Sequence, residues 1–356
     1  MAADRSAEIA ERVREAAARG TPLIPQGGGT KAFLGEAVAG EPLPLAGHEG
    51  IVGYEPTELV ITARAGTPLA EVEAALAAQG QMLGFEPPRL GAASTLGGVV
   101  AAGLSGPRRP WAGALRDFVL GVRLVNGRGE VLRFGGQVMK NVAGYDLSRL
   151  MAGAQGTLGV LLEVSLRVVP RPVREQTRVL ALDAAGALER LAGLARRPLP
   201  LAGACHVAGR LHLRLAGAAA GVEAAAAEVG GEVMGEAEAA AFWDGVRDLA
   251  HPFFRDGEGA LWRIALPPAA PPLPLAGEWL LDWGGGQRFL RSAEPAGRIR
   301  EVAAAAGGHA TRLSGPAAGV TVFHPLPEPI LRLHRRLKAA LDPHGILNPG
   351  RLYPGL

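Results

Sequence analysis

The stretch Pro25-Gln26-Gly27-Gly28-Gly29-Thr30-Lys31 decides how the N-terminal part of this chain folds. Three successive glycines allow backbone conformations with positive φ and a close approach of the main chain to a ligand. Successive N–H groups in such a turn form an anion-binding nest, to which Thr30 adds a hydroxyl donor and Lys31 a positive charge. The apolar run Leu23-Ile24 before it is suitable for a strand. A phosphate or pyrophosphate would therefore fit this loop.

The loop departs from two common phosphate-binding templates. A P-loop needs Gly-Lys followed by Ser or Thr, whereas Lys31 follows Thr30 and precedes Ala32. A dinucleotide fingerprint needs Gly-x-Gly-x-x-Gly at the start of a helix, and residues 33–35 continue as loop. Taken alone, the stretch could equally be an ordinary glycine-rich turn.

Two further loops have the same character. Residues 91–98 (GAASTLGG) continue to residues 103–106 (GLSG), and residues 153–159 (GAQGTLG) precede a strand. Small residues and hydroxyls dominate these stretches, so they have too little side-chain volume to pack by themselves. Three such loops within the first 160 residues indicate one large, extended, phosphate-bearing ligand.

Composition excludes several classes of protein. The 356 residues, 48% of them hydrophobic, are enough for two or three domains with a sizeable core. The single cysteine, Cys205, excludes an internal disulfide and an all-cysteine iron–sulfur cluster or zinc site made by this chain alone. A net charge of +3, with arginine spread along the chain, argues against nucleic-acid binding. One-electron chemistry would need an organic cofactor or a partner.

The N-terminal segment Met1–Gly20 mixes acidic with basic residues, which predicts an amphipathic helix rather than a signal peptide. No run of about 18 apolar residues is free of charge, so no transmembrane helix is expected. We expect a cytoplasmic protein without direct membrane insertion. Any peripheral attachment to the inner membrane would run through a partner.

The first half predicts short strands between the glycine loops. Apolar, β-branched runs predict strands at Leu59–Ala63 and Leu158–Val169. Val119–Val125 and Glu130–Phe134 flank an Asn-Gly turn at Asn126, which is a strong hairpin signal. The strands thus predict a sheet that the loops connect.

Two helices have clear signals in the sequence. Thr67 as N-cap and Pro68 at the first helical position predict a helix that ends at Gly80. Pro329–Leu341 predicts an amphipathic helix near the C-terminus, whose apolar face would consist of Ile330, Leu333, Leu337 and Leu341.

The character of the chain changes after about residue 172. Glycine loops become rarer, and strands alternate with alanine-rich helices, which predicts an α+β domain around one antiparallel sheet. The expected elements are strands at Leu211–Leu215 and Leu261–Leu266, a hairpin of Glu278–Trp283 with Gln287–Arg291, and helices at Ala218–Val229 and Ala296–Ala306.

Several longer stretches identify a family. They are residues 54–60 (YEPTELV), 64–69 (RAGTPL), 80–83 (GQML), 85–88 (FEPP), 103–111 (GLSGPRRPW), 138–153 (VMKNVAGYDLSRLMAG) and 345–350 (GILNPG). With them the chain resembles FAD-linked oxidases of the vanillyl-alcohol oxidase / p-cresol methylhydroxylase superfamily, and most of all the FAD-binding subunits of bacterial glycolate oxidases. The resemblance covers essentially the whole chain and is densest over residues 54–170.

The resemblance implies an α+β fold. A two-lobed FAD-binding domain of the p-cresol methylhydroxylase type would comprise residues 1–172. An α+β cap domain built on an antiparallel sheet would comprise residues 173–320. Residues 321–356 would form a C-terminal helix and tail that return to the FAD domain, with Asn348 near the flavin.

The resemblance also implies the cofactor and the residues that hold it. Some relatives attach FAD through a histidine in the first glycine loop, and residues 27–30 contain none, so FAD is expected to bind non-covalently. The implied cofactor-binding residues are Pro25, Gln26, Gly27, Gly28, Gly29, Thr30, Lys31, Pro87, Ser94, Thr95, Gly97, Gly98, Ser105, Gly106, Gly113, Gly144, Tyr145, Asp146, Gly156, Thr157, Gly159, Val160 and Asn348.

The substrate side departs from the family pattern. Relatives that oxidise 2-hydroxy acids have two histidines around a Gly-Asp-Gly-Asn turn and a later Glu-His-Gly, which together position a metal and a base. Here His206 and His212 flank Val-Ala-Gly-Arg-Leu, which lacks the aspartate, and no Glu-His-Gly follows. We therefore predict no metal site and no catalytic base, although a hairpin could still place both histidines together.

Two other pairs have competing explanations. Tyr145-Asp146 resembles an acid–base pair, but capping a helix beside the flavin is the preferred explanation. Arg108-Arg109 could bind a substrate carboxylate, contact a partner subunit or only solvate a loop.

The implied function is that of an oxidoreductase subunit. The chain would work beside a catalytic FAD subunit and an iron–sulfur subunit of glycolate oxidase. The complex would oxidise glycolate, with D-lactate as an alternative substrate, by hydride transfer to flavin. The FAD of this chain would be a relay or accessory redox group. Two alternatives stay open: a non-catalytic scaffold, or a stand-alone FAD-dependent 2-hydroxy-acid dehydrogenase.

Overall fold

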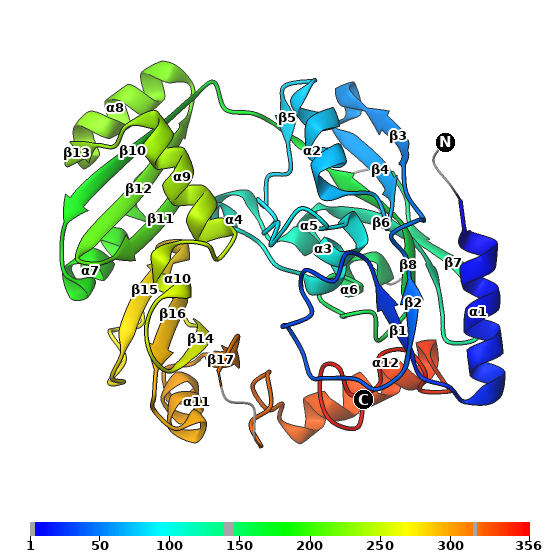
Figure 1. The fold of residues 1–356 in the computed structure, drawn as a ribbon. Helices are drawn as coiled ribbons and strands as arrows, with labels where there is room; N and C mark the ends of the chain where they lie inside the picture. The colour runs from blue at the N-terminus through cyan, green and yellow to red at the C-terminus, as the bar shows by residue number, and fades with distance from the viewer. Residues whose placement is uncertain (1–3, 138–145, 316–318) are drawn as a thin grey trace. The chain divides into compact units, whose positions relative to one another are not determined.

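The computed structural model describes residues 4–137, 146–315 and 319–356 (Figure 1). The chain forms two compact units. The first unit comprises residues 1–104, 114–170 and 325–356, and the second comprises residues 105–113 and 171–324. Within the described residues, no helix is both long enough and apolar enough to span a membrane.

The predicted N-terminal helix is confirmed as α1 (Ser6–Arg19), which ends at Gly20 in a left-handed conformation. Its buried face packs on the parallel pair β1 (Leu23–Gln26) and β2 (Glu41–Pro44) and on two strands of the neighbouring sheet. Because Leu23 of β1 also pairs in parallel with Leu347, the C-terminal tail belongs to the same small layer.

The larger sheet of the first unit is antiparallel, in the order β3-β4-β8-β6-β7. The predicted hairpin is confirmed, because Asn126 Oδ1 accepts hydrogen bonds from the N–H groups of residues 128 and 130. The predicted long strand is divided into β8 and β9. The strand bounds are β3 (Ile51–Glu55), β4 (Val60–Arg64), β5 (Gln81–Met82), β6 (Val119–Val125), β7 (Val131–Gly135), β8 (Val160–Arg167) and β9 (Val169–Pro170).

The helices of this unit correct two expectations. Helix α2 (Leu69–Ala77) begins after Pro68, and Thr67 does not cap it. The Thr67 hydroxyl instead accepts a hydrogen bond from Gly50 N at 2.9 Å. The second glycine stretch is partly helical, since α3 (Leu96–Ala102) starts at Thr95, whose hydroxyl accepts from the helix at 3.3 Å. The other short helices are α5 (Leu115–Phe118) and α6 (Leu147–Leu150).

Helix α12 (Glu328–Leu341) turns a different face inward from the one expected. Ile330, Leu333 and Leu337 are exposed, whereas Lys338 and Leu341 are buried. The Lys338 ammonium accounts for this, because it bonds to Asp342 Oδ2 at 2.6 Å and to two main-chain carbonyls. A buried, fully hydrogen-bonded cation therefore determines the orientation of this helix.

The second unit is built on an eight-stranded antiparallel sheet, as predicted, in the order β13-β10-β12-β11-β15-β16-β14-β17. Its strands are β10 (Arg174–Ala181), β11 (Leu201–Val207), β12 (Arg210–Gly217), β13 (Glu232–Val233), β14 (Ala260–Ala265), β15 (Glu278–Asp282), β16 (Gln287–Ser292) and β17 (His309–Arg312). The predicted hairpin is β15–β16, joined by a 3-10 turn, η2 (Trp283–Gly285).

The two faces of this sheet differ in chemistry. One face is apolar and is covered by α7 (Ala184–Leu194), α8 (Ala219–Val229) and α11 (Ala296–Ala305). Helices α9 (Glu236–Arg247) and α10 (Pro252–Arg255) pack on part of the other face. That second face carries buried or half-buried polar side chains on most of its strands: Thr177, His212, Arg214, Arg263, Asp282, Gln287, Arg291 and Thr311.

Candidate cofactor site

The three glycine loops cross one another at backbone distance. A Cβ at Gly28 would lie 1.6 Å from the carbonyl oxygen of Ala93 in the second loop. A Cβ at Gly103 would lie 2.7 Å from Gly153 Cα in the third loop. Only glycine permits such crossings, so each loop is fixed against the next. The loops that the sequence singled out separately are therefore parts of one arrangement.

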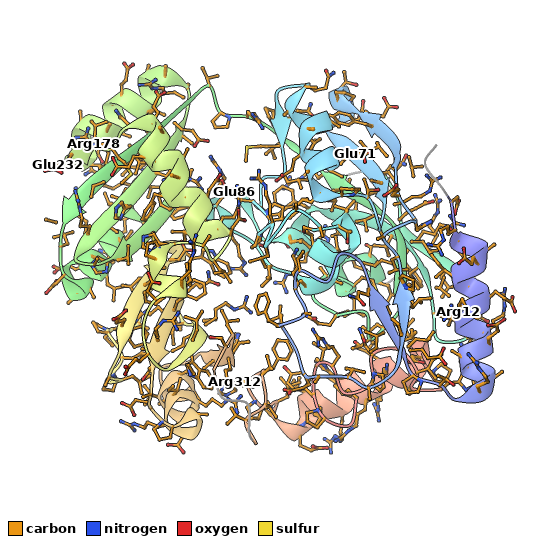
Figure 2. The ribbon with its side chains drawn as sticks, viewed as in Figure 1. Arg12, Glu71, Glu86, Arg178, Glu232 and Arg312 are labelled. Atoms are coloured by element: carbon orange, nitrogen blue, oxygen red, sulfur yellow. The ribbon has the colours of Figure 1, made fainter. Side chains whose placement is uncertain are left out.

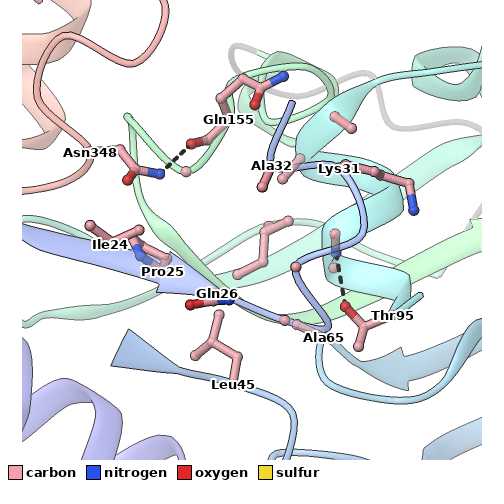
Figure 3. A pocket seen from close by; sticks show the side chains of 18 of the residues that line it. Ile24, Pro25, Gln26, Lys31, Ala32, Leu45, Ala65, Thr95, Gln155 and Asn348 are labelled. Carbon is pink, nitrogen blue, oxygen red and sulfur yellow. Dashed lines mark hydrogen bonds between the residues drawn. The ribbon is translucent and has the colours of Figure 1, made fainter. Parts of the chain in front are cut away.

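A cavity of about 250 Å³ lies where these loops meet (Figure 3). Pockets for whole small molecules span roughly 300–1,000 Å³, so this cavity suits one part of an extended ligand. Its wall contains most of the residues predicted to hold the cofactor: Pro25, Gln26, Gly27, Gly28, Gly29, Thr30, Lys31, Thr95, Gly97, Gly98, Gly156, Gly159 and Asn348.

The cavity wall is cationic. Its charged side chains are Lys31 and Arg351, and no aspartate or glutamate is among the lining residues in the described part of the chain. Lys31 Nζ donates to Ser94 Oγ at 2.7 Å and to Thr30 Oγ1 at 3.1 Å, so its ammonium is held at the mouth of the first loop. A wall with fixed positive charge and glycine N–H groups is suited to phosphate oxygens.

Asn348 contributes a buried acceptor to the cavity wall. Its side chain is 5% exposed, and Nδ2 donates to Gln155 O at 2.7 Å (Figure 3). Oδ1 is buried without a hydrogen-bond partner among the residues that the structure describes, and the residue has a φ of 42°, which non-glycine residues rarely adopt. A buried unsatisfied acceptor costs free energy, so a ligand that donates a hydrogen bond here would be stabilised.

The tail that carries Asn348 is attached at several points. Asn348 N donates to Leu23 O at 2.9 Å, which continues the pairing with β1. Arg351 donates to Glu36 O, Ala32 O and Leu34 O, each at 2.7 Å, so the tail also holds the segment that follows the first loop. These contacts could not be predicted from local sequence patterns, because more than 310 residues lie between the two segments.

Not every predicted residue lines the cavity. Pro87, Ser94, Thr157 and Val160 are buried in the first unit but lie outside the cavity wall. Ser105, Gly106 and Gly113 belong to the second unit. Gly144 and Tyr145 are outside the described residues. Asp146 caps α6, with Oδ1 accepting from Arg149 N at 3.1 Å, so the capping prediction is confirmed.

Part of the cavity wall was not predicted from the sequence. Ala101 and Ala102 were missed because α3 was expected to be a loop, and Gln155 lies inside a predicted loop without having been chosen. Arg351 follows the Asn348-Pro349-Gly350 stretch directly, and a cation beside an expected cofactor residue was an available signal. The remaining missed residues are small or apolar: Ile24, Ala32, Val38, Leu45, Ala65 and Leu161.

Comparisons with known proteins identify the family. Residues 1–135 match the FAD binding domain family, and residues 326–352 match the C-terminal domain of FAD linked oxidases. The chain is 50% identical to glycolate oxidase subunit GlcE of Escherichia coli (strain K12) over 99% of both chains. The chain belongs to the GlcE family. It is an FAD-binding protein among the FAD-dependent oxidoreductases that act on CH–OH groups.

Other proteins are less similar to this GlcE-family chain. Glycolate oxidase subunit GlcD of Bacillus subtilis (strain 168) is 33% identical over 45% of this chain and 34% of its own length. A solved alkyldihydroxyacetonephosphate synthase covers 96% of this chain and 74% of its own, with a TM-score of 0.66 and 16% identity. That likeness supports the fold alone, and it agrees with the predicted α+β class.

The cavity fits FAD on the structure's own evidence. FAD has a pyrophosphate for the cationic wall and several hydrogen-bond donors for the orphaned Asn348 Oδ1. It is also longer than the cavity, as an extended ligand would be. The residues that would hold it include those of the three loops that line the cavity, together with Lys31 and Asn348.

The two histidines of this GlcE-family chain cannot bind one metal ion. The register pairs His206 with Leu211 and Cys205 with His212, so the two imidazoles point to opposite faces of the sheet. His206 Nε2 lies 2.9 Å from Leu182 O, and His212 stacks on Phe242 with ring centroids 4.0 Å apart. Burial lowers the pKa of His212 to about 4, which keeps it neutral at neutral pH.

The described residues contain no group of three or more His, Cys, Asp or Glu that could hold a metal ion. The adjacent arginines have separate roles. Arg108 is buried and forms an ion pair with Glu175, so it does not solvate a loop. The Arg109 guanidinium lies over the Trp283 ring, 4.3 Å from its centroid.

Proposed function

We propose that this chain is the accessory FAD-binding subunit of a glycolate-oxidising complex. The observation that carries the proposal is the 50% identity to a glycolate oxidase subunit over 99% of both chains. Its partners would be a catalytic FAD subunit and an iron–sulfur subunit. The complex would convert glycolate to glyoxylate, which removes two electrons and two protons from the substrate, with D-lactate as a second candidate. FAD, when bound, supplies the acceptor for this pair of electrons.

The structural support concerns how this chain would hold FAD. No histidine, cysteine or tyrosine is among the lining residues in the described ranges, which favours non-covalent binding. The three loops would hold the pyrophosphate, Lys31 would balance its charge, and Asn348 Oδ1 would accept one hydrogen bond. We further propose that residues 1–172 and 321–356 form the FAD-binding part and residues 173–320 the cap.

An accessory role is favoured by what this chain offers for electron and proton transfer. Its only cysteine, Cys205, is fully buried, and burial raises the pKa of its thiol well above the usual value. An iron–sulfur carrier would therefore reside in a partner. The opposed orientation of His206 and His212 removes the motif that catalytic relatives use, so glycolate oxidation would occur mainly in the catalytic subunit.

The test is to produce this chain with and without the catalytic and iron–sulfur subunits and to record visible spectra before and after anaerobic glycolate. We expect the three subunits to co-purify, this chain alone to carry FAD that dissociates on denaturation, and its flavin absorbance to bleach only in the complex. Absence of flavin even after addition of FAD would favour the scaffold alternative. Bleaching of the isolated chain would favour a stand-alone dehydrogenase.

A further inference from the structure

Two neighbouring strands of the second unit, β14 and β17, bring a polar set of side chains together on one face. Arg263 of β14 pairs with Thr311 of β17 and with Phe289 of β16, and His309 pairs with Ala265. Side chains of directly paired residues share a face, as do residues two apart on one strand. Arg263, Thr311 and His309 therefore lie side by side on the polar face of the sheet.

Arg263 differs from the other arginines of this sheet. It is half-buried, and it has no hydrogen bond or ion pair with any residue that the structure describes. By contrast, Arg312 (Figure 2) donates to Gly315 O at 2.9 Å, and Arg291 donates to Phe254 O at 2.6 Å. A half-buried guanidinium without partners loses hydration without compensation.

The positive charge of a second guanidinium adds to the free-energy cost of burying Arg263. Burial lowers the pKa of Arg263 to about 10, and the positive charge of Arg109 contributes to the shift. An anion that binds to Arg263 would reduce the repulsion between the two positive charges. The structure thus places positive charge on this face and provides no carboxylate partner for Arg263 within the described residues.

The turn that supports Arg109 is strained. Trp283, whose ring lies under the Arg109 guanidinium, has a φ of 54°, and Gly284 and Gly285 follow with φ of 64° and 92°. Trp283 Nε1 donates to Gly106 O at 3.0 Å, and the buried Arg288 donates to Gly285 O at 3.1 Å. A bulky residue in the left-handed region persists only where its surroundings fix it, which is common at binding sites.

Neutral hydrogen-bonding groups accompany the charges. His309 is on the same face as Arg263, and burial together with the charges of Arg263 and His324 lowers its pKa, so its imidazole is neutral at neutral pH. Thr311 adds a hydroxyl beside Arg263. A neutral imidazole and a hydroxyl can each donate one hydrogen bond without adding to the charge repulsion.

We propose that Arg263, with Arg109, His309 and Thr311, forms a binding site for a small carboxylate such as a 2-hydroxy acid or its 2-oxo acid. The inference rests on the proposed function for the identity of the ligand, but the site itself follows from the side chains of the second unit. The planar guanidinium fork matches the two oxygens of a carboxylate. His309 and Thr311 would then be available for the adjacent hydroxyl or carbonyl oxygen.

The test is a calorimetric titration of the full chain, loaded with FAD, with oxalate. Oxalate is a planar carboxylate that FAD enzymes of this type would not oxidise as an alcohol, so binding is measured without turnover. We expect saturable binding that weakens at least tenfold in R263Q and less in R263K, which keeps the charge but loses the fork. R210Q is the matched control, because Arg210 is an exposed arginine of the same sheet, paired with Glu232 at 3.2 Å.

Three results would overturn the proposal. They are the absence of oxalate binding to the wild-type chain, unchanged affinity in both Arg263 variants, and binding of inorganic phosphate or neutral glycolamide as tight as that of oxalate. If R263Q does not fold, the oxalate affinities of R263K and R109Q are compared with that of the wild type instead. The measurement needs no partner subunit, so failure of the complex to assemble would count against the proposed function and not against this site.

Discussion

Replacing Lys338 by methionine tests how the C-terminal tail is attached to the cofactor site. The Lys338 side chain is buried, and its ammonium donates to Thr157 O at 2.9 Å, Asp342 Oδ2 at 2.6 Å and Leu347 O at 2.5 Å. The three acceptors belong to the third glycine loop, the end of α12 and the tail. Methionine has a similar length and no charge, so K338M removes all three hydrogen bonds with little change in packing.

The size of the stability loss in K338M depends on the hydrogen bonds that Asp342 keeps. Removing one partner of a buried ion pair costs about 3–5 kcal/mol. The Asp342 carboxylate keeps two main-chain donors, Ile346 N at 3.2 Å and Leu347 N at 2.8 Å, so it is not left without partners. We therefore expect the free energy of unfolding to fall by about 3 kcal/mol, the lower end of that range. FAD affinity should fall too, because Leu347 directly precedes Asn348.

The assay is urea unfolding of the apo chain followed by circular dichroism, with a separate FAD titration by flavin fluorescence. The control is R335M, which breaks the exposed Arg335–Glu328 pair and should cost less than about 1 kcal/mol. In K338M/D342N the negative charge is gone, so part of the lost stability should return. The reasoning would be refuted if K338M unfolded like R335M, or if it lost stability while binding FAD as tightly as the wild type.

Three further predictions concern the first unit. G28A should abolish FAD binding, because its Cβ would lie 1.6 Å from a carbonyl oxygen of the crossing loop, whereas G53A, with no atom within 4 Å of its Cβ, should bind normally. N348A should weaken FAD binding about fivefold, since the one hydrogen bond to the ligand, of about 1 kcal/mol, is lost, and equal dissociation constants would contradict the role of its side chain. Burial lowers the pKa of His48 in the folded state. Its contribution to the free energy of unfolding is therefore complete above about pH 6.5, where the imidazole is neutral in both states, and is lost as the pH falls toward the lowered pKa of the folded state. Unfolding of H48Q should depend less on pH in this range than that of the wild type or of the exposed-site control H344Q, and parallel pH profiles would contradict the assignment.

Local sequence signals were enough to predict much of the secondary structure. The Asn126 turn predicted its hairpin because the side chain bonds within four residues of itself. Helix α1 and the antiparallel character of the sheet in the second unit also followed from periodicity and composition. Helix α3 was missed since glycine and alanine suggested a loop, although Thr95 supplied an N-cap. Such elements depend on residues close in sequence, and their signals are local.

The sequence by itself determined the class of ligand. Three glycine loops, one cysteine and the family-specific stretches were sufficient to predict a bound FAD and the lack of an iron–sulfur cluster in this chain. The phosphate-bearing character of the ligand and the lack of a cluster follow from short motifs and composition, and the identity of the ligand as FAD follows from the resemblance to the family.

Tertiary structure alone decided how the side chains are combined. The strand register separated His206 from His212, because a shift of one residue moves a side chain to the other face of a sheet. The order of the strands placed Arg263 beside Thr311, although 47 residues lie between them, and tail pairing placed Asn348 at the first loop. Contacts between distant segments depend on pairing and burial across the whole fold, and no local pattern in the sequence encodes them.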